Sequence, residues 1–244
     1  AERIDLQNGN LEPIISAPGR GMSFVADHQG RIRFAYGEDD AGDIKVYLHP
    51  VDGEGWQEMP NVEPSRSTPL AFNRTDSLVY FTCSPKDGGF GICTWNPHTK
   101  QWNTVWSNPR VEASGLLHGM AGDEIAGVRY EDGRPGLALF DGDSAYANVL
   151  IGLMKQFPGE DVRFVSGSSD GRLGIVRVDA DMDPGTFYLY DRDTRKLTSL
   201  LAVAPWIDPM KMAAKQAFDF KARDGLPLQG YLSYPPGEEK ATHL

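Results

Sequence analysis

Pairs of short apolar strands joined by a polar turn recur along this chain at a nearly constant interval. The first apolar residue after the turn is Leu11, Trp56, Trp102 or Leu197 in successive copies. The first three lie 45 and 46 residues apart, and the last gap of 95 residues is two periods. A fixed period of this size is typical of a repeat fold, because each copy buries its apolar surface only by stacking on its neighbours.

A degenerate copy fills the double interval, and a second hairpin precedes each copy with the same spacing. The degenerate copy runs from Leu139 through Asp141-Gly142-Asp143 to Val149 and Leu150. The preceding hairpins run from Phe24 to Phe34, from Leu70 to Phe81 and from Val162 to Val178, with a weaker member around Gly122-Asp123. Each unit therefore contains four short strands in two hairpins.

We interpret this unit as the four-stranded blade of a β-propeller, which makes the chain all-β. The segments alternate apolar and polar residues and carry almost no helical periodicity, so helical repeats fit poorly. Four blades fit between residue 12 and about residue 205, and one strand of a preceding blade lies before them. Closed propellers have about four to eight blades. We therefore expect an arc of about four blades, whose exposed terminal faces and edges favour self-association.

One segment alone predicts a helix. It runs from Tyr146 to Gln156 and ends at Phe157-Pro158-Gly159, where Pro and Gly disfavour continuation. We expect this helix on an insertion between strands of the fourth unit.

The composition excludes several partners. Asp and Glu outnumber Lys and Arg by 34 to 24, for a net charge of −10. Nucleic-acid binding needs a basic patch, so it is disfavoured. No run approaches 18 apolar residues, so no membrane-spanning segment is expected. The start, Ala1-Glu2-Arg3, has neither an initiating Met nor a signal peptide and predicts a cut inside a longer protein, which leaves the compartment open.

The two cysteines flank a Gly-rich turn. Cys83 and Cys93 enclose Pro85-Lys86-Asp87-Gly88-Gly89, which places them on the two arms of one hairpin. A disulfide between adjacent strands needs restrictive geometry, and free cysteines are common in cores. We therefore favour free thiols over a disulfide.

The last sixty residues carry a family resemblance. They contain Asp183 to Asp191, then Pro205-Trp206-Ile207-Asp208-Pro209, then Phe220 to Leu232 and a closing Pro235-Pro236. This order resembles the propeller-to-hydrolase junction of the prolyl oligopeptidase family of serine peptidases, nearest its acylaminoacyl-peptidase and dipeptidyl-aminopeptidase-like bacterial branch. The resemblance is strong from about residue 161 to 236. Before that, it rests on the blade repeat.

The resemblance implies a domain boundary and a role. In the family, a propeller of seven or eight blades caps an α/β-hydrolase domain and restricts the active site to short peptides. Residues 1–207 would be part of that propeller. Residues 208–244 would be the linker and first strands of the hydrolase domain, and Phe218 to Leu232 would form its opening β-hairpin around an Asp224-Gly225 turn.

The family's chemistry lies outside the matched residues. It uses a His-Gly-Gly segment, a Ser on a strand-to-helix elbow, then Asp and His, and none of these is present in the sequence. No catalytic, cofactor-binding or metal-binding residue can be carried over. The partners implied are the catalytic domain and short peptides, whose termini Arg and Asp residues on inner strands would contact. A non-enzymatic propeller that binds a protein or ligand is the alternative.

Two motifs look functional but have simpler explanations. Gly167-Ser168-Ser169-Asp170-Gly171 matches the G-x-S-x-G pattern of a hydrolase, yet a strand pattern follows it where a helix is required, so we interpret it as a hairpin turn. Asp179, Asp181 and Asp183 have calcium-loop spacing without the required Gly and Glu, so we expect a solvated turn.

The histidines and tryptophans indicate no site. The histidines lie far apart without a metal-ligand partner, and we expect surface residues, with His118 a candidate for burial. The tryptophans follow the repeat, so we expect them to pack between blades. The histidines are His28, His49, His98, His118 and His243, and the tryptophans are Trp56, Trp95, Trp102, Trp106 and Trp206.

Overall fold

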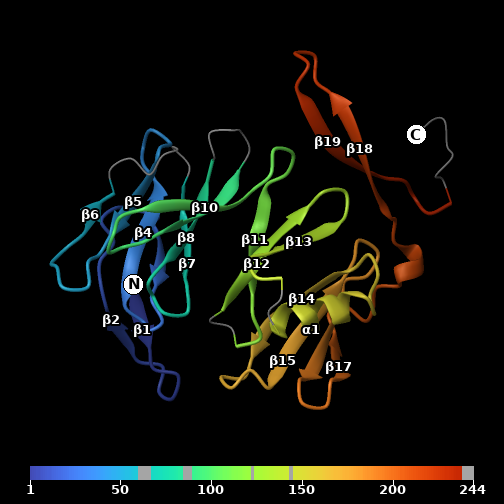
Figure 1. Cartoon of the computed structure of the whole chain (residues 1–244), viewed down its shortest axis with the longest axis horizontal. Helices are drawn as coiled ribbons and strands as arrows, with labels where there is room; N and C mark the ends of the chain where they lie inside the picture. Colours follow the sequence, from blue (N-terminus) through green and yellow to red (C-terminus); the bar gives the residue numbers. More distant parts are fainter. Residues whose placement is uncertain (60–66, 85–89, 122–123, 143–144, 238–244) are drawn as a thin grey trace. The chain divides into compact units, whose positions relative to one another are not determined.

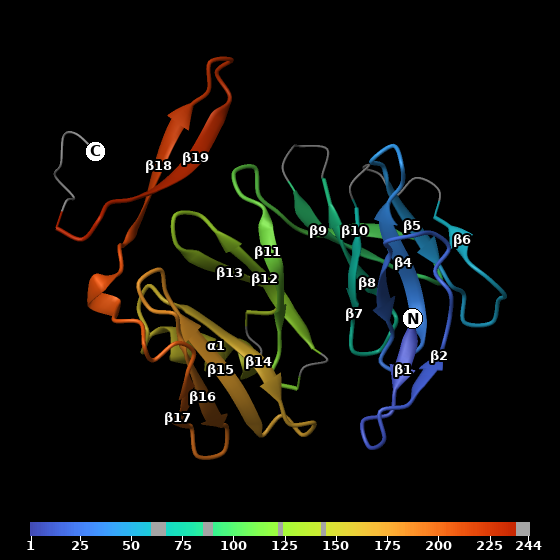
Figure 2. The same ribbon diagram turned by 180° about the vertical axis from the view of Figure 1, so that it is seen from behind.

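A computed structural model describes residues 1–59, 67–84, 90–121, 124–142 and 145–237. The chain divides into two compact units, Ala1–Glu112 and Ala113–Leu244. Both are built from antiparallel sheets whose strands follow one another in chain order (Figures 1 and 2). The predicted all-β fold class is therefore confirmed.

The first unit contains a hairpin and two four-stranded sheets. The hairpin pairs β1 with β2, and the sheets are β3-β4-β5-β6 and β7-β8-β9-β10, with every neighbouring pair antiparallel. The strands are β1 (Glu2–Ile4), β2 (Leu11–Pro13), β3 (Ser23–Ala26), β4 (Ile32–Glu38), β5 (Ile44–Leu48), β6 (Gln57–Glu58), β7 (Pro69–Phe72), β8 (Val79–Cys83), β9 (Gly91–Trp95) and β10 (Trp102–Ser107).

The second unit contains a three-stranded sheet, a helix, a four-stranded sheet and a hairpin. The sheets are β11-β12-β13 and β14-β15-β16-β17, and β18 pairs with β19. The elements are β11 (Ala113–His118), β12 (Ile125–Glu131), β13 (Pro135–Leu139), α1 (Ala145–Met154), β14 (Asp161–Gly167), β15 (Leu173–Asp179), β16 (Thr186–Asp191), β17 (Lys196–Ala202), the 3-10 turn Pro209–Lys211, β18 (Lys215–Lys221) and β19 (Pro227–Ser233).

The strand register repeats with the predicted period. In the first unit Phe81 pairs with Cys93, and in the second Val176 pairs with Tyr188, each partner 95 residues further along the chain. The hairpin turns repeat as well. Gly30, Asp76 and Gly171 all have a positive φ, at intervals of 46 and 95 residues.

The first residue of these turns explains why the turns repeat. Asp27, Asn73 and Ser168 each donate a backbone N–H to the carbonyl oxygen of a residue four or five positions ahead, at the start of the returning strand. Each also accepts the N–H of that same residue on a side-chain oxygen, at 2.9 to 3.0 Å. Short polar side chains close such turns by replacing backbone hydrogen bonds.

An aromatic core joins the two sheets of the first unit. The ring of Phe34 on β4 lies 5.8 Å from that of Phe72, 5.6 Å from that of Phe81 and 6.0 Å from that of Trp95, all on the neighbouring sheet. Phe34 and Phe81 are fully buried. Neither sheet can bury its apolar face alone, and this contact is what makes the two sheets one unit.

In the second unit, α1 completes the core between the two sheets. Its side chains Tyr146, Leu150 and Leu153 are buried with Leu117 of the three-stranded sheet and Val176 of the four-stranded one. No helix within the described ranges has the length and apolarity needed to cross a membrane.

The structure corrects three expectations about the repeat. Val149 and Leu150 lie in α1 and not in a fourth strand, because their side chains complete an apolar helical face that packs on the core. The helix lies between the third and fourth sheets, outside the fourth unit where it was expected. The segment before the first blade contains two paired strands, β1 and β2, instead of one. The weak turn at Gly122-Asp123 lies outside the described residues.

The preference for free cysteines is wrong. Cys83 and Cys93 form a disulfide between β8 and β9, with their Cα atoms 5.8 Å apart. Cys83 pairs with Gly91 in the register, so Cys93 is its diagonal neighbour on the same face of the sheet. Both positions face the interior, which allows the two sulfur atoms to meet. The turn between them, residues 85–89, lies outside the described residues.

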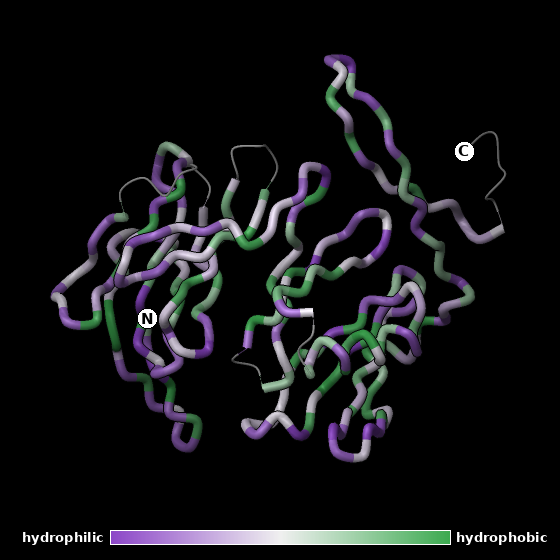
Figure 3. Tube along the Cα trace, in the orientation of Figure 1, coloured by the Kyte–Doolittle hydropathy of each residue, from purple (hydrophilic) through white to green (hydrophobic). Residues whose placement is uncertain are grey.

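The hairpin β18–β19 forms at its predicted place. Gly225 has a φ of 89°, which glycine adopts readily, and the Asp224 carboxylate accepts the N–H of Leu226 at 3.1 Å, as short polar side chains do in turns. Both apolar and polar residues occur along its strands (Figure 3), and Phe218 and Phe220 alternate with Asp219 and Lys221 on β18. The rings of Phe218 and Phe220 stack 5.6 Å apart and are nearly half exposed, so this hairpin has an apolar surface that the rest of the described chain does not cover.

Candidate functional site

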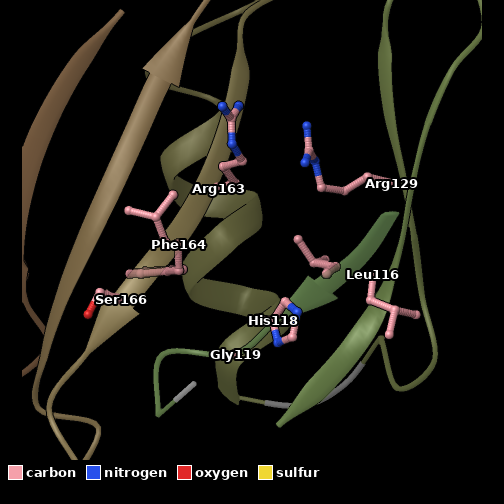
Figure 4. A pocket seen from close by; sticks show the side chains of 9 residues that line it. Leu116, His118, Gly119, Arg129, Arg163, Phe164 and Ser166 are labelled. Atoms are coloured by element: carbon pink, nitrogen blue, oxygen red, sulfur yellow. The ribbon is translucent and has the colours of Figure 1, made fainter. Parts of the chain in front are cut away.

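A pocket of about 400 Å³ lies between the three-stranded sheet and β14 of the second unit. It is lined by apolar side chains and by two arginines (Figure 4). Figure 4 shows Arg129 and Arg163 at one end, and His118 and Gly119 at the other. The complete lining is Leu116, Leu117, His118, Gly119, Arg129, Arg163, Phe164, Val165 and Ser166.

Two close approaches hold the walls of the pocket together. Gly167 at the end of β14 passes Met120 so closely that a Cβ atom there would lie 1.6 Å from the Met120 carbonyl oxygen. On the other wall, the buried Tyr146 hydroxyl donates a hydrogen bond to the carbonyl oxygen of His118 at 2.7 Å. Burial raises the pKa of Tyr146, and the charge of Glu124 adds to this, so the hydroxyl keeps its proton and donates.

An ion-pair network forms the charged end of the pocket. Asp161 on β14 accepts a hydrogen bond from Nη2 of Arg129 at 2.5 Å and a second one from Arg163. Arg163 Nη1 also lies 2.8 Å from Asp179 Oδ1, and Arg177 Nε lies 3.0 Å from the same oxygen. That oxygen and Arg177 Nε are buried without a well-aligned hydrogen-bond partner, so their attraction is ionic only.

Arginines outnumber aspartates among these ion pairs, and the charge of Asp179 also acts on Glu160. Three guanidinium groups, from Arg129, Arg163 and Arg177, face the two carboxylates of Asp161 and Asp179. The Arg129 side chain is 27% exposed and that of Arg163 is 16% exposed, so both are largely shielded from water and from its screening. A pocket with an apolar wall and two fixed hydrogen-bond donors is suited to binding a small ligand.

Of the serine and the three aspartates that looked functional in the sequence, only Asp179 takes part in the network at this pocket. Ser169 lies in the turn from β14 to β15, and a strand follows it, which confirms the hairpin interpretation. The three aspartates have separate partners: Asp181 accepts the backbone N–H of Lys215 at 2.5 Å, and Asp183 accepts that of Gly185 at 2.8 Å. Asp179 belongs to the arginine network.

The histidines follow the prediction with one exception. His118, the candidate for burial, is instead exposed and lines the pocket. His28 contacts Asp76 of the next sheet at 2.6 Å, and His49 packs against Trp56 with ring centroids 5.3 Å apart. His98 lies in an exposed turn. His243 lies outside the described residues.

The tryptophans follow the packing prediction only in part. Trp95 is buried between the two sheets of the first unit, and Trp102 packs on it with ring centroids 6.3 Å apart. Trp56 instead donates its indole N–H to Ser16 at 2.8 Å and holds the segment before the first blade. Trp206 is 80% exposed, so the expectation that it packs between blades was wrong.

The sequence analysis did not find the pocket. Asp161 and Arg163 are two residues apart on one strand, so they share a face, which is a readable signal for an ion pair. Arg129 comes from a strand 32 residues earlier, and only the packing of the two sheets brings it to Asp161.

The comparisons with known proteins agree with the fold. The chain is 23% identical over 225 residues to dipeptidyl peptidase family member 6 of Caenorhabditis elegans, a match that spans 87% of this chain and 30% of the relative. The chain resembles the prolyl oligopeptidase family. It spans less than a third of the length of that curated relative. No protein-family model matches the sequence.

Solved structures of that family and of other propellers share the fold. A post-proline cleaving enzyme from Rickettsia typhi matches with a TM-score of 0.50 and 11% identity, over 84% of this chain and 31% of the enzyme. TolB from Acinetobacter baumannii matches with a TM-score of 0.53 and 15% identity, over 95% of this chain and 56% of TolB. At sequence identities of 11% and 15%, these matches show a shared fold and nothing about activity.

Proposed function

We propose that this chain is part of the propeller of a prolyl-oligopeptidase-type serine peptidase and limits access to its active site to short peptides. The observation that carries the proposal is the sequence match to a dipeptidyl peptidase family member over 87% of the chain. The blade sheets support it, because a ring of packed blades forms a passage that excludes folded proteins. The chain itself performs no catalysis in this proposal.

The partner of the chain would be an α/β-hydrolase domain. The support is the hairpin β18–β19, where Phe218, Phe220 and Leu228 are all more than a third exposed. A two-stranded hairpin is marginal in water on its own, and a packed neighbour would stabilise it. Residues 1–207 would then belong to the propeller and residues 208–244 to the linker and first strands of that domain.

The test is a peptidase assay on the product of the complete gene, with the 244-residue chain as the matched control. Substrates are chromogenic aminoacyl- and acyl-peptides, a series of longer peptides, and a protein such as casein. The complete product should cleave the short peptides, lose kcat/KM as the peptide lengthens, and leave casein intact. A serine-reactive phosphonate should abolish this activity.

Two results would contradict the proposal. Phosphonate-sensitive turnover by the 244-residue chain alone would refute its non-catalytic role. Cleavage of casein by the complete product as fast as that of short peptides would refute the access filter.

A non-enzymatic binding propeller is the second candidate. The observation that favours it is the match to TolB, which spans a larger share of the partner than the enzyme matches do. Absence of peptidase activity in the complete product, together with stable capture of a protein partner by it, would decide for this candidate.

A further inference from the structure

We propose that the pocket between β11, β12 and β14 binds a small ligand that combines a carboxylate with an apolar group. The carboxylate would contact Arg129 and Arg163, and the apolar group would lie along Leu116 and Val165. The proposal concerns binding and does not depend on the peptidase proposal, because it is tested without turnover.

The two arginines favour a carboxylate. Arg129 carries five N–H donors, and Asp161 accepts from one of its nitrogen atoms, so donors remain to receive a second carboxylate. A guanidinium group matches the two oxygen atoms of a carboxylate in a paired geometry.

The rest of the lining favours an apolar group on the same ligand. Leu116, Leu117, Phe164 and Val165 supply most of the wall beyond the arginines. A volume of about 400 Å³ is in the range of small-molecule pockets. Inorganic phosphate or acetate would contact the guanidinium groups only, and the apolar side chains of the wall would stay exposed to water. We therefore expect both ions to bind more weakly than an apolar acid.

The experiment is isothermal titration calorimetry on the full chain with N-acetyl-leucine, its neutral amide and acetate. N-acetyl-leucine should bind with saturation and about tenfold or more tightly than either control. A tenfold change corresponds to about 1.4 kcal/mol, which is the size of one charge-assisted hydrogen bond. Two further probes identify the source of the carboxylate. Tighter binding of N-acetyl-glycyl-leucine assigns a peptide terminus, and tighter binding of 4-methylpentanoate assigns a free acid.

Two variants of the network should act in opposite directions. R129Q should weaken the binding of N-acetyl-leucine about tenfold, because it removes a charged donor. D161N should strengthen it, because it removes the carboxylate that competes for both arginines. R192Q is the matched control, since Arg192 is half exposed and does not line the pocket. Circular dichroism confirms that each variant is folded.

The proposal is overturned if the acid and its amide bind equally, or if neither binds with saturation. It is also overturned if folded D161N binds the acid no more tightly than the unaltered chain. A structural role for Asp161 alone would weaken binding or leave it unchanged, whereas the proposal requires an increase.

Discussion

In the Ala1–Glu112 unit, aromatic rings fill the space between two blade sheets, whereas in the Ala113–Leu244 unit a helix fills much of it. Phe34 contacts three aromatic rings of the next sheet. In the second unit, α1 brings Leu150 and Leu153 to the core, and an arginine-lined pocket remains beside it. The comparison teaches that the repeat specifies the sheets and their hairpins, while the groups that fill the space between the sheets differ from one unit to the other.

The largest expected effect tests the aromatic core of the first unit. Phe34→Ala removes a fully buried ring and should lower the free energy of unfolding by about 3–5 kcal/mol. Leu150→Ala is the matched change in the second unit and should cost about 2–5 kcal/mol. Four of the five tryptophans lie in the first unit, so tryptophan fluorescence reports on it, and hydrogen exchange reports on both. We expect each variant to lose protection from hydrogen exchange mainly in its own unit. If each variant lost protection equally in both units, the two cores would not be independent and the comparison would fail.

The next effect tests the disulfide, which the second unit lacks. The positions 95 residues after Cys83 and Cys93 hold Val178 and Tyr188, which occupy the same places in the register. Replacing both cysteines by serine should destabilise the first unit by about 3 kcal/mol, the loop-closure contribution for a loop of this length. Denaturant unfolding with and without a reductant measures it. A reductant that leaves the unaltered chain's unfolding midpoint unchanged would contradict the prediction.

A smaller effect tests the turn at Asp27, whose counterpart in the second unit is the uncharged Ser168. Burial by itself would raise the pKa of Asp27, but hydrogen bonds from the backbone N–H and guanidinium of Arg31 outweigh it and hold the pKa below 3.8. The lowered pKa stabilises the fold above about pH 3.8, and this contribution is lost as the pH falls below that value.

Asp27→Asn should therefore weaken the first unit at pH 7 by about 1–3 kcal/mol and flatten its loss of stability below pH 4. Asn keeps an acceptor for the turn, as Asn73 does in the next sheet, so the change isolates the charge. Unfolding curves from pH 2.5 to 7 measure it. If the free energy of unfolding of Asp27→Asn fell below pH 4 as steeply as that of the unaltered chain, Asp27 would not titrate as described.

The smallest effect compares equivalent turns in the two units. Lys100 and Arg195, 95 residues apart, have φ values of 58° and 54°, which favour glycine. Lys100→Gly and Arg195→Gly should each stabilise the chain by about 0.5–1 kcal/mol, and by similar amounts if the turns are equivalent. Thermal unfolding gives both values. A gain in one unit and a loss in the other would show that the turns differ.

The sequence predicts the hairpins well because their signals are local. The polar turn at Asp27 and the Asp224-Gly225 turn each close between neighbouring residues, and both form as expected. The helix at 146–156 is also found from its pattern. Its place is not, because only tertiary packing shows that Leu150 belongs to the core between two sheets.

The candidate pocket depends on contacts that no local pattern contains. Arg129 meets Asp161 across 32 residues, and Gly167 meets Met120 across 47. The disulfide was missed for a related reason. Whether two cysteines on adjacent strands lie on the same face depends on the register, and the register depends on the loop between them.

The measurement that tests the account most directly is an NMR assignment of residues 135–154. The account predicts sequential amide–amide contacts from Ala145 to Met154, and contacts between α1 and β14. Cross-strand contacts that pair residues 145–154 with β13 would contradict it. The β11-β12-β13 sheet would then have a fourth strand, as the two large sheets of the first unit do.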